Sequence, residues 1–128
     1  MNPYQHVPYN QYQLDYYHHY RQQNEVSRIY QAFRQEHPEL INELGTLGMD
    51  EQLITYISRA VIQYSLAHAN QFSGTINNRT TNIYESMLRQ LPWLIYLLQA
   101  YHLSGNQMRR ILRTMIRFTL QQIRNSYY

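Results

Sequence analysis

Apolar side chains recur at helical spacing along most of the chain. Val26, Ile29, Tyr30 and Phe33 follow the i, i+3, i+4, i+7 pattern that places one stripe along one side of an α-helix. Strand-like alternation is weak throughout, and no repeat of fixed period is evident. With 128 residues the chain has room for one hydrophobic core. The pattern therefore predicts an all-α fold, a small bundle of four to six helices.

Residues that favour the ends of helices divide the first half of the chain into three predicted helices. Asn24 is a good cap for the first helix. His37-Pro38 should end that helix, because a residue that precedes proline is pushed out of the α region. Pro38 then suits the first turn of a short second helix, which Gly45 and Gly48 are expected to close. Asp50 should cap the third helix.

The second half shows similar signals. Asn82 with Glu85 three positions later resembles a capping box and predicts the start of a helix that Pro92 interrupts. The segment after Pro92 is apolar nearly all round, so we expect it to be the central element, with Trp93 buried. Ser104-Gly105-Asn106-Gln107 is a second capping-box pattern and predicts a last helix over about 105–125.

The N-terminal segment has a different composition. Residues 1–22 are rich in Tyr, Gln and His and nearly lack aliphatic side chains, so they cannot build a core of their own. We expect them to form a flexible arm that can become helical near its end, with residues 23–128 forming the helical domain. The arm carries six tyrosines as candidates for oxidative cross-linking: Tyr4, Tyr9, Tyr12, Tyr16, Tyr17 and Tyr20.

Catalytic constellations are hard to find. The chain has no cysteine and no phosphate-binding glycine loop, nucleophile elbow or zinc-protease motif. Glu36, Glu39 and Glu43 could share one helix face, but such a row is more typical of a solvated surface. His18 and His19 are adjacent, and adjacent side chains on a helix diverge from any common metal ion. We therefore expect no enzymatic activity, no cofactor and no metal site.

The cellular location is predicted from two absences. The N-terminus is polar and aromatic, which is unlike a secretory signal. The longest apolar run, from Leu91 to Leu98, is shorter than the ~20 residues that a transmembrane helix needs. We therefore expect an intracellular protein without a transmembrane segment.

The last predicted helix has the clearest charge pattern. At 100° per residue, five arginines fall within an arc of roughly 100°, and no acidic residue occurs from Ser104 onward. These candidate interaction residues are Arg109, Arg110, Arg113, Arg117 and Arg124. Residues 21–51 carry an excess of acidic side chains instead, so charge is separated along the chain.

Two kinds of partner would suit this arginine stripe. One is phosphate, which would make the protein an Arg-rich nucleic-acid- or phosphate-binding module. The other is the acidic segment, through Glu36, Glu39, Glu43 or Asp50, within the same fold or a neighbouring subunit. The net charge of +3 is low and no base-reading motif occurs, so we favour the acidic partner and do not expect a nucleic-acid partner. The separated charges, the uncharged apolar segment from Leu91 to Tyr101 and the N-terminal arm lead us to expect a homo-oligomer.

A short segment carries a resemblance to a known family. Phe33-Arg34-Gln35-Glu36-His37-Pro38-Glu39-Leu40-Ile41 is similar to a Phe…His-Pro-x-Leu-Ile segment of small spore coat proteins from endospore-forming bacilli, which also have Tyr/Gln/His-rich arms. The resemblance implies a non-catalytic component of a proteinaceous shell. Its partners would be itself or other coat proteins, its location would be the spore coat, and its tyrosines would be available for cross-linking.

Overall fold

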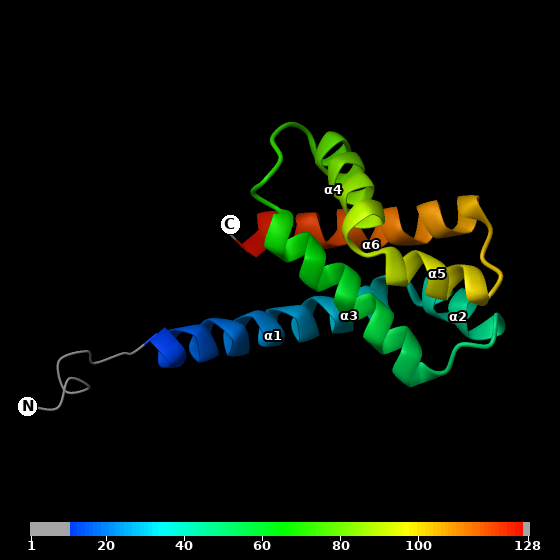
Figure 1. Cartoon of the computed structure of the whole chain (residues 1–128), viewed down its shortest axis with the longest axis horizontal. Coiled ribbons are helices and arrows are strands. Elements are labelled where there is room, and N and C mark those ends of the chain that lie inside the picture. The colour runs from blue at the N-terminus through cyan, green and yellow to red at the C-terminus, as the bar shows by residue number, and fades with distance from the viewer. Residues whose placement is uncertain (1–10, 127–128) are drawn as a thin grey trace, which may run out of the picture.

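A computed structural model describes the backbone of residues 11–126 and the side chains of residues 21–123. Within these residues the fold is all-α, as predicted, and contains no strand. The six helices are α1 (Gln11–Glu36), α2 (Pro38–Thr46), α3 (Glu51–His68), α4 (Ile76–Gln90), α5 (Pro92–Ala100) and α6 (Gly105–Ser126) (Figure 1).

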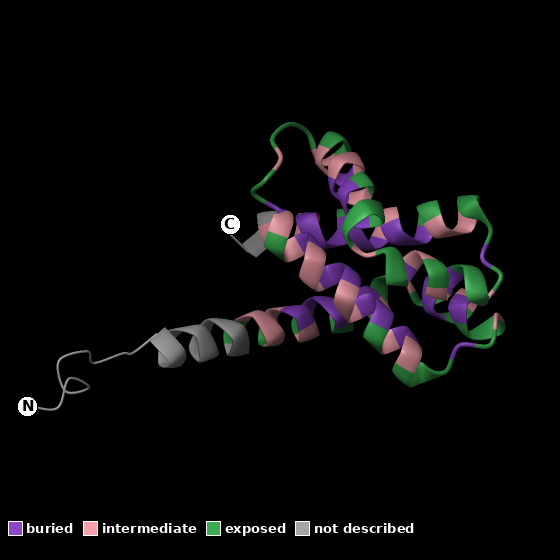
Figure 2. Ribbon diagram, viewed as in Figure 1, coloured by how far each residue is buried: buried purple, intermediate pink, exposed green. Residues whose placement is uncertain are grey.

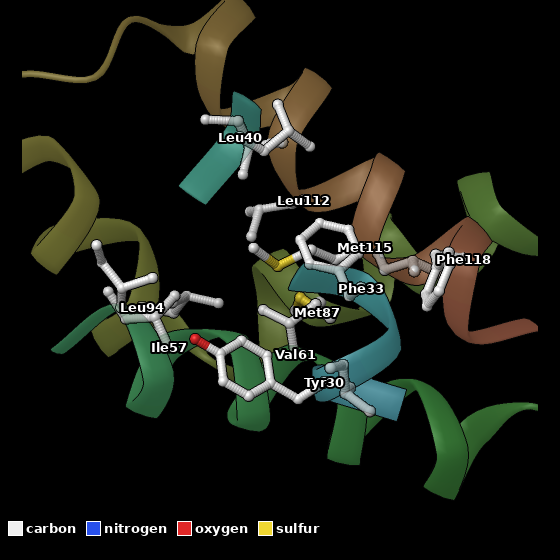
Figure 3. Close-up of a cluster of buried hydrophobic side chains, with 14 of the residues drawn as sticks. Tyr30, Phe33, Leu40, Ile57, Val61, Met87, Leu94, Leu112, Met115 and Phe118 are labelled. Carbon is white, nitrogen blue, oxygen red and sulfur yellow. The ribbon is translucent and has the colours of Figure 1, made fainter. Parts of the chain in front are cut away.

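Helix α6 lies at the centre of the bundle, because it packs against α1, α3 and α4 (Figure 1). All six helices contribute buried side chains to one core, and Figure 3 shows Phe33, Val61, Met87, Leu94 and Leu112 converging there. The exposed surface follows the outer faces of the same helices (Figure 2).

Several helix ends lie where the sequence predicts them. Helix α1 ends one residue before His37, and Pro38 begins α2. The Asp50 carboxylate accepts a hydrogen bond from the Leu53 amide at 2.8 Å and so caps α3. Ser104 and Gln107 form the predicted capping box, in which each side chain bonds the other's backbone amide, at 3.1 and 2.9 Å.

Two predicted helix starts are wrong. Helix α1 begins at Gln11, well before Asn24, so the absence of aliphatic residues did not mark a helix boundary. Helix α4 begins at Ile76, because the Thr75 hydroxyl accepts a hydrogen bond from the Asn78 amide at 3.1 Å and caps the helix there. The Asn82–Glu85 pattern consequently falls inside α4.

The prediction that the segment after Pro92 is central and that Trp93 is buried is also wrong. Helix α5 buries Leu94 and Leu98, whereas Trp93 is 39% and Tyr96 is 70% exposed. The helix packs mainly against α4, at the edge of the bundle. Its apolar composition therefore exceeds what its own packing requires.

The structure also shows a tandem repeat that the sequence analysis missed. Equivalent helix boundaries in the two halves of the chain are 54 residues apart. This offset holds for the ends of α1 and α4, for both ends of α2 and α5, and for the starts of α3 and α6. Pro38 and Pro92, which begin α2 and α5, are one such pair. We call residues 22–69 the first repeat and residues 76–123 the second repeat. Each repeat is a helix, a proline corner, a nine-residue helix, a tight turn and a long helix.

Local hydrogen bonds repeat with the same offset. The Met49 and Leu103 amides each donate to a carbonyl in the last turn of the preceding helix, at 3.4 and 3.3 Å. The turns contain Gly48 with φ +103° and His102 with φ +66°, so the second repeat places a side chain in the left-handed region that favours glycine. His102 thus follows the C-cap residue Tyr101 and takes the left-handed conformation that commonly ends a helix.

The two repeats pack as equivalent halves. Helix α1 packs on α3 and α4 packs on α6, while α3 and α6 pack on each other between the halves. Helix α1 also contacts α6, and α4 contacts α3. This is the isologous pattern of a symmetric dimer, in which each half offers the same surface to the other. The fold is therefore a pseudo-symmetric pair of three-helix units.

Candidate functional site

An open pocket of about 330 Å³ lies between α4 and α6, the two helices that cross in Figure 1. Four of the five arginines of the predicted stripe line it, together with four neutral polar side chains. We call this site the cationic pocket, and it is lined by Asn77, Thr80, Asn106, Arg109, Arg110, Arg113, Thr114 and Arg117. The side chain of Arg124 lies outside the described residues.

Arg110 has the acidic partner that the sequence analysis favoured, and it lies within the same chain. Its guanidinium contacts the Glu43 carboxylate of α2 at 2.5 Å. The Gln107 amide also donates to Glu43, at 3.3 Å. The hydrogen bond from Arg110 holds the pKa of Glu43 below its ordinary value, and the same contact raises the pKa of Arg110. One arginine of the pocket is therefore neutralised by the fold.

The other expected acids do not meet the stripe. Glu39 pairs with the His37 ring at 3.1 Å, and its pKa is lowered by a backbone hydrogen bond and by His37. Asp50 caps α3, as described above. Glu36 is exposed and has no ion-pair partner among the described side chains. Glu43 is thus the acid of this set that joins the arginine stripe.

The remaining pocket arginines differ in their roles. Arg113 donates to the Thr81 hydroxyl at 2.8 Å and so links α6 to α4. Arg59 occupies the counterpart position in the first repeat and donates to Ser27 at 2.6 Å, which is the counterpart of Thr81. Arg109 and Arg117 are exposed, and within the described part of the chain no hydrogen-bond or ion-pair partner reaches them.

Thr80 adds an unusual polar group to the cationic pocket. Its side chain is 1% exposed, and its hydroxyl has no hydrogen-bond partner among the described residues. A buried hydroxyl without a partner costs about 1–3 kcal/mol. Sequence reasoning missed Thr80, although a threonine within the apolar stripe of α4 was a visible signal.

A second surface of the molecule is aromatic. Tyr56 of α3 and Trp93 of α5 lie with their ring centroids 5.8 Å apart, and Tyr96 follows Trp93 by one helical turn. Tyr56 is 61% exposed, so both helices offer aromatic area to solvent. We call Tyr56, Trp93 and Tyr96 the aromatic surface. No acidic or basic residue other than His102 occurs from Leu91 to Leu103.

The segment that carries the spore coat resemblance forms the first proline corner. The Phe33 ring lies 5.1 Å from the His37 ring and 5.4 Å from the Phe118 ring, and Leu40 and Ile41 are buried. Its Pro-x-Leu-Ile pattern recurs at the second corner as Pro92-Trp93-Leu94-Ile95. These residues therefore build the repeat and line neither of the two surfaces.

The candidate cross-linking tyrosines lie beyond what the structure describes in detail. Tyr4 and Tyr9 precede the described residues. Tyr12, Tyr16, Tyr17 and Tyr20 fall within the bounds of α1, but their side chains are not described. Among the side chains that the structure describes, those of residues 21–123, no group of three His, Asp or Glu could hold a metal ion. Of the helices that the structure describes, none is both long and apolar enough to cross a membrane.

Comparisons with known proteins add no identification. No protein-family model matches the chain, and neither a curated protein nor a solved structure gives a significant match.

Proposed function

We propose that this chain is a non-catalytic structural protein that self-associates through its aromatic surface, as a component of an assembly such as a bacterial spore coat. The observation that carries the proposal is the exposure of Tyr56, Trp93 and Tyr96 on an uncharged part of the bundle. Exposed aromatic side chains in a region depleted of charge are typical of the centre of a protein–protein interface.

The repeat shows that folding does not require these aromatic residues. The counterparts of Trp93 and Tyr96 on α2 are Glu39 and Asn42, and both are exposed. The same position on the same short helix is therefore polar in one repeat and aromatic in the other. Because the fold accepts either kind of side chain, the aromatic residues of α5 are left for a role outside the fold.

A second copy of the chain is the occupant that we favour for this surface. Each copy carries a net charge of +3, divided between an acidic segment, residues 21–51, and the basic helix α6. From Leu91 to Leu103 there is no acidic or basic residue other than His102, so two aromatic surfaces can meet without burying an unpaired charge. An isologous dimer at this surface would repeat the kind of contact that already joins the two halves.

The coat assignment rests on the resemblance and on composition. The segment from Phe33 to Ile41 and the six tyrosines of the N-terminal region are similar to those of small coat proteins. In this proposal a peroxide oxidises pairs of phenols once the bundles have assembled: each phenol loses one hydrogen, a bond forms between the two rings, and the peroxide is reduced to water. The tyrosines available for this coupling are Tyr4, Tyr9, Tyr12, Tyr16, Tyr17 and Tyr20. Detection of the protein in the insoluble coat fraction of purified spores, against its absence there, tests this location.

Sedimentation velocity over a range of protein concentrations tests self-association. The double variant Trp93→Glu, Tyr96→Asn takes both residues from the counterpart positions of the first repeat, so the bundle should fold normally. We expect the wild type to form dimers or larger species and the double variant to stay monomeric. A wild type that is monomeric at every concentration and salt level would contradict the proposal.

The matched control is Arg109→Thr, which also takes its residue from the first repeat, where Thr55 is the counterpart. It changes an exposed side chain of the cationic pocket and leaves the aromatic surface intact. Self-association should persist in this variant at low and high salt. Loss of association in the control, with retention in the double variant, would assign assembly to the arginine stripe instead.

A further inference from the structure

We propose that the cationic pocket binds the phosphate group of a small phosphorylated molecule. The residues that line the pocket carry positive charge and no negative charge. Of the four arginines, Arg110 is paired with Glu43, and no acidic side chain lines the pocket. Arg109 and Arg117 face the same space, and among the described residues neither has a partner. The pocket thus presents uncompensated guanidinium groups, which are suited to oxyanion recognition.

The first repeat separates the arginines that the fold needs from those that it does not. The counterparts of the pocket residues, in the same order, are Gln23, Val26, Gln52, Thr55, Tyr56, Arg59, Ala60 and Gln63. Arg59 is the single arginine of that set, and it ties α3 to α1 through Ser27 and Gln23, at 2.6 and 2.8 Å. Its counterpart Arg113 makes the matching bond to Thr81.

Arg109, Arg110 and Arg117 have no arginine counterpart in the first repeat, although the order of helices is the same. Arg110 is used by the fold, because it pairs with Glu43. Arg109 and Arg117 have no such pair among the described residues, and the first repeat has the neutral Thr55 and Gln63 in their place. We take the concentration of positive charge in the second repeat as the mark of an anionic ligand.

Thr80 is the second, independent observation. Its counterpart Val26 is 0% exposed and fills the same place in the helix stripe with an apolar group. The second repeat has a hydroxyl there instead, buried beside the arginines and unpaired among the described residues. The hydroxyl is covered in this structure, so a phosphate oxygen would reach it only after a neighbouring side chain moves aside, and it would then accept the missing hydrogen bond and remove the cost of its burial.

The shape of the site favours a small ligand over duplex nucleic acid. A volume of about 330 Å³ lies at the lower end of the range of about 300–1,000 Å³ that is typical of small-molecule sites. The asparagines Asn77 and Asn106 at the rim can bond the part of the ligand that carries the phosphate. Duplex DNA presents its phosphates on an extended convex surface, which matches a pocket of this size less well than a single phosphate group does.

Isothermal titration calorimetry tests the proposal with three probes: inorganic phosphate, adenosine 5′-monophosphate and adenosine. Sodium chloride at matched ionic strength corrects for general screening. We expect both phosphates to bind with a saturable isotherm and adenosine to be silent. Binding by the nucleotide alone would place the ligand among phosphate esters, whereas equal binding would assign the site to free phosphate. No heat beyond the chloride control would overturn the proposal.

Three variants, each carrying residues from the first repeat, locate the site. Arg109→Thr with Arg117→Gln should weaken phosphate binding about tenfold or more, since a hydrogen bond to a charged group contributes about 1.5–3 kcal/mol. Thr80→Val should also weaken binding while leaving the ligand-free melting temperature unchanged or higher. Arg89→Gln removes one exposed charge of α4 outside the pocket and should bind as the wild type does.

Two results would overturn the assignment. Equal weakening by Arg89→Gln and by the Arg109, Arg117 pair would show attraction to net charge and not a site. Tight, salt-sensitive binding of duplex DNA, lost in the same pair while phosphate has no effect, would assign the stripe to the nucleic-acid backbone. The aromatic surface takes no part in this experiment, so its outcome is independent of self-association.

Discussion

The two repeats have the same backbone plan and different surfaces. Where the first repeat meets α5, Tyr56 of α3 lies against Trp93. Where the second repeat meets α2, the counterpart Arg110 of α6 pairs with Glu43. Tyr56 and Arg110 are counterparts, 54 residues apart, whereas their partners Trp93 and Glu43 occupy different positions of the short helices. One position of the fold has thus become aromatic in one half and charged in the other.

This difference separates folding from function within a single molecule. Residues shared by the halves build the unit: Pro38 and Pro92 at the corners, Ile57 and Ile111 in the core, Arg59 and Arg113 between long helices. Residues that differ on exposed positions form the aromatic surface and the cationic pocket. Each repeat therefore serves as an internal control for the other.

The largest expected effect concerns the shared core. Ile57 and Ile111 are each 1% exposed at counterpart positions. Replacing either by alanine should destabilise the protein by about 2–5 kcal/mol, because a buried side chain is removed and a cavity is left. Urea denaturation of both variants measures the cost. A large loss in one variant and none in the other would show that the halves are not equivalent in packing.

Helix caps should show a smaller effect of similar size in both halves. Asp50 and Ser104 begin α3 and α6 with one side-chain hydrogen bond each to a backbone amide. Substitution of either by alanine should cost about 1 kcal/mol of stability. Shifts of the urea midpoint at constant m-value would measure it. A cost at Asp50 without one at Ser104 would mean that Gln107 holds the capping box alone.

Trp93 predicts a cost that is set mainly by one ring contact. Trp93→Glu, which copies Glu39, should cost the monomer about 0.5–1.5 kcal/mol, because the side chain is already 39% exposed and loses mainly its contact with the Tyr56 ring. A buried tryptophan would have cost about 3–5 kcal/mol on truncation. Native fluorescence should be accessible to iodide in the monomeric state. Emission shielded from iodide at low protein concentration would contradict the exposed placement.

Acid sensitivity should distinguish the charged contact from the aromatic one. The pKa of Glu43 is lowered from its ordinary value of 4.5, so its pair with Arg110 stabilises the fold fully at a pH above 4.5. This contribution is lost as the pH falls through the lowered pKa. Glu43→Leu copies Leu97 and removes this titration. Melting temperatures from pH 7 to pH 3 should therefore fall slightly less in the variant. Parallel curves would mean that the pair does not contribute.

Much of the fold was readable from local signals. Proline corners, the Asp50 cap and the Ser104–Gln107 box mark helix ends through backbone chemistry that needs no tertiary context. The helix stripe of α6 likewise predicted which face is buried and which carries arginine. The start of α4 was predicted at Asn82 and lies at Ile76, because Thr75 caps the helix. A local sequence pattern cannot decide between two possible caps.

The surfaces were harder to predict, because they depend on which helices meet. The apolar composition of α5 predicts that its side chains are buried, but it does not predict whether they pack against the same chain or against another protein. The arginine stripe was visible, but its pairing with Glu43 joins α2 to α6 across most of the chain. The repeat itself was hidden because its halves share spacing and burial more than they share residue types.

The link between the halves also has a consequence for assembly. Each three-helix unit buries its inner face against the other unit, and one connection, from residue 69 to residue 75, lets them fold back on each other. A unit from a neighbouring molecule offers the same inner face. Shortening this connection would prevent the fold-back and favour a domain-swapped dimer, in which the same cores form between two chains.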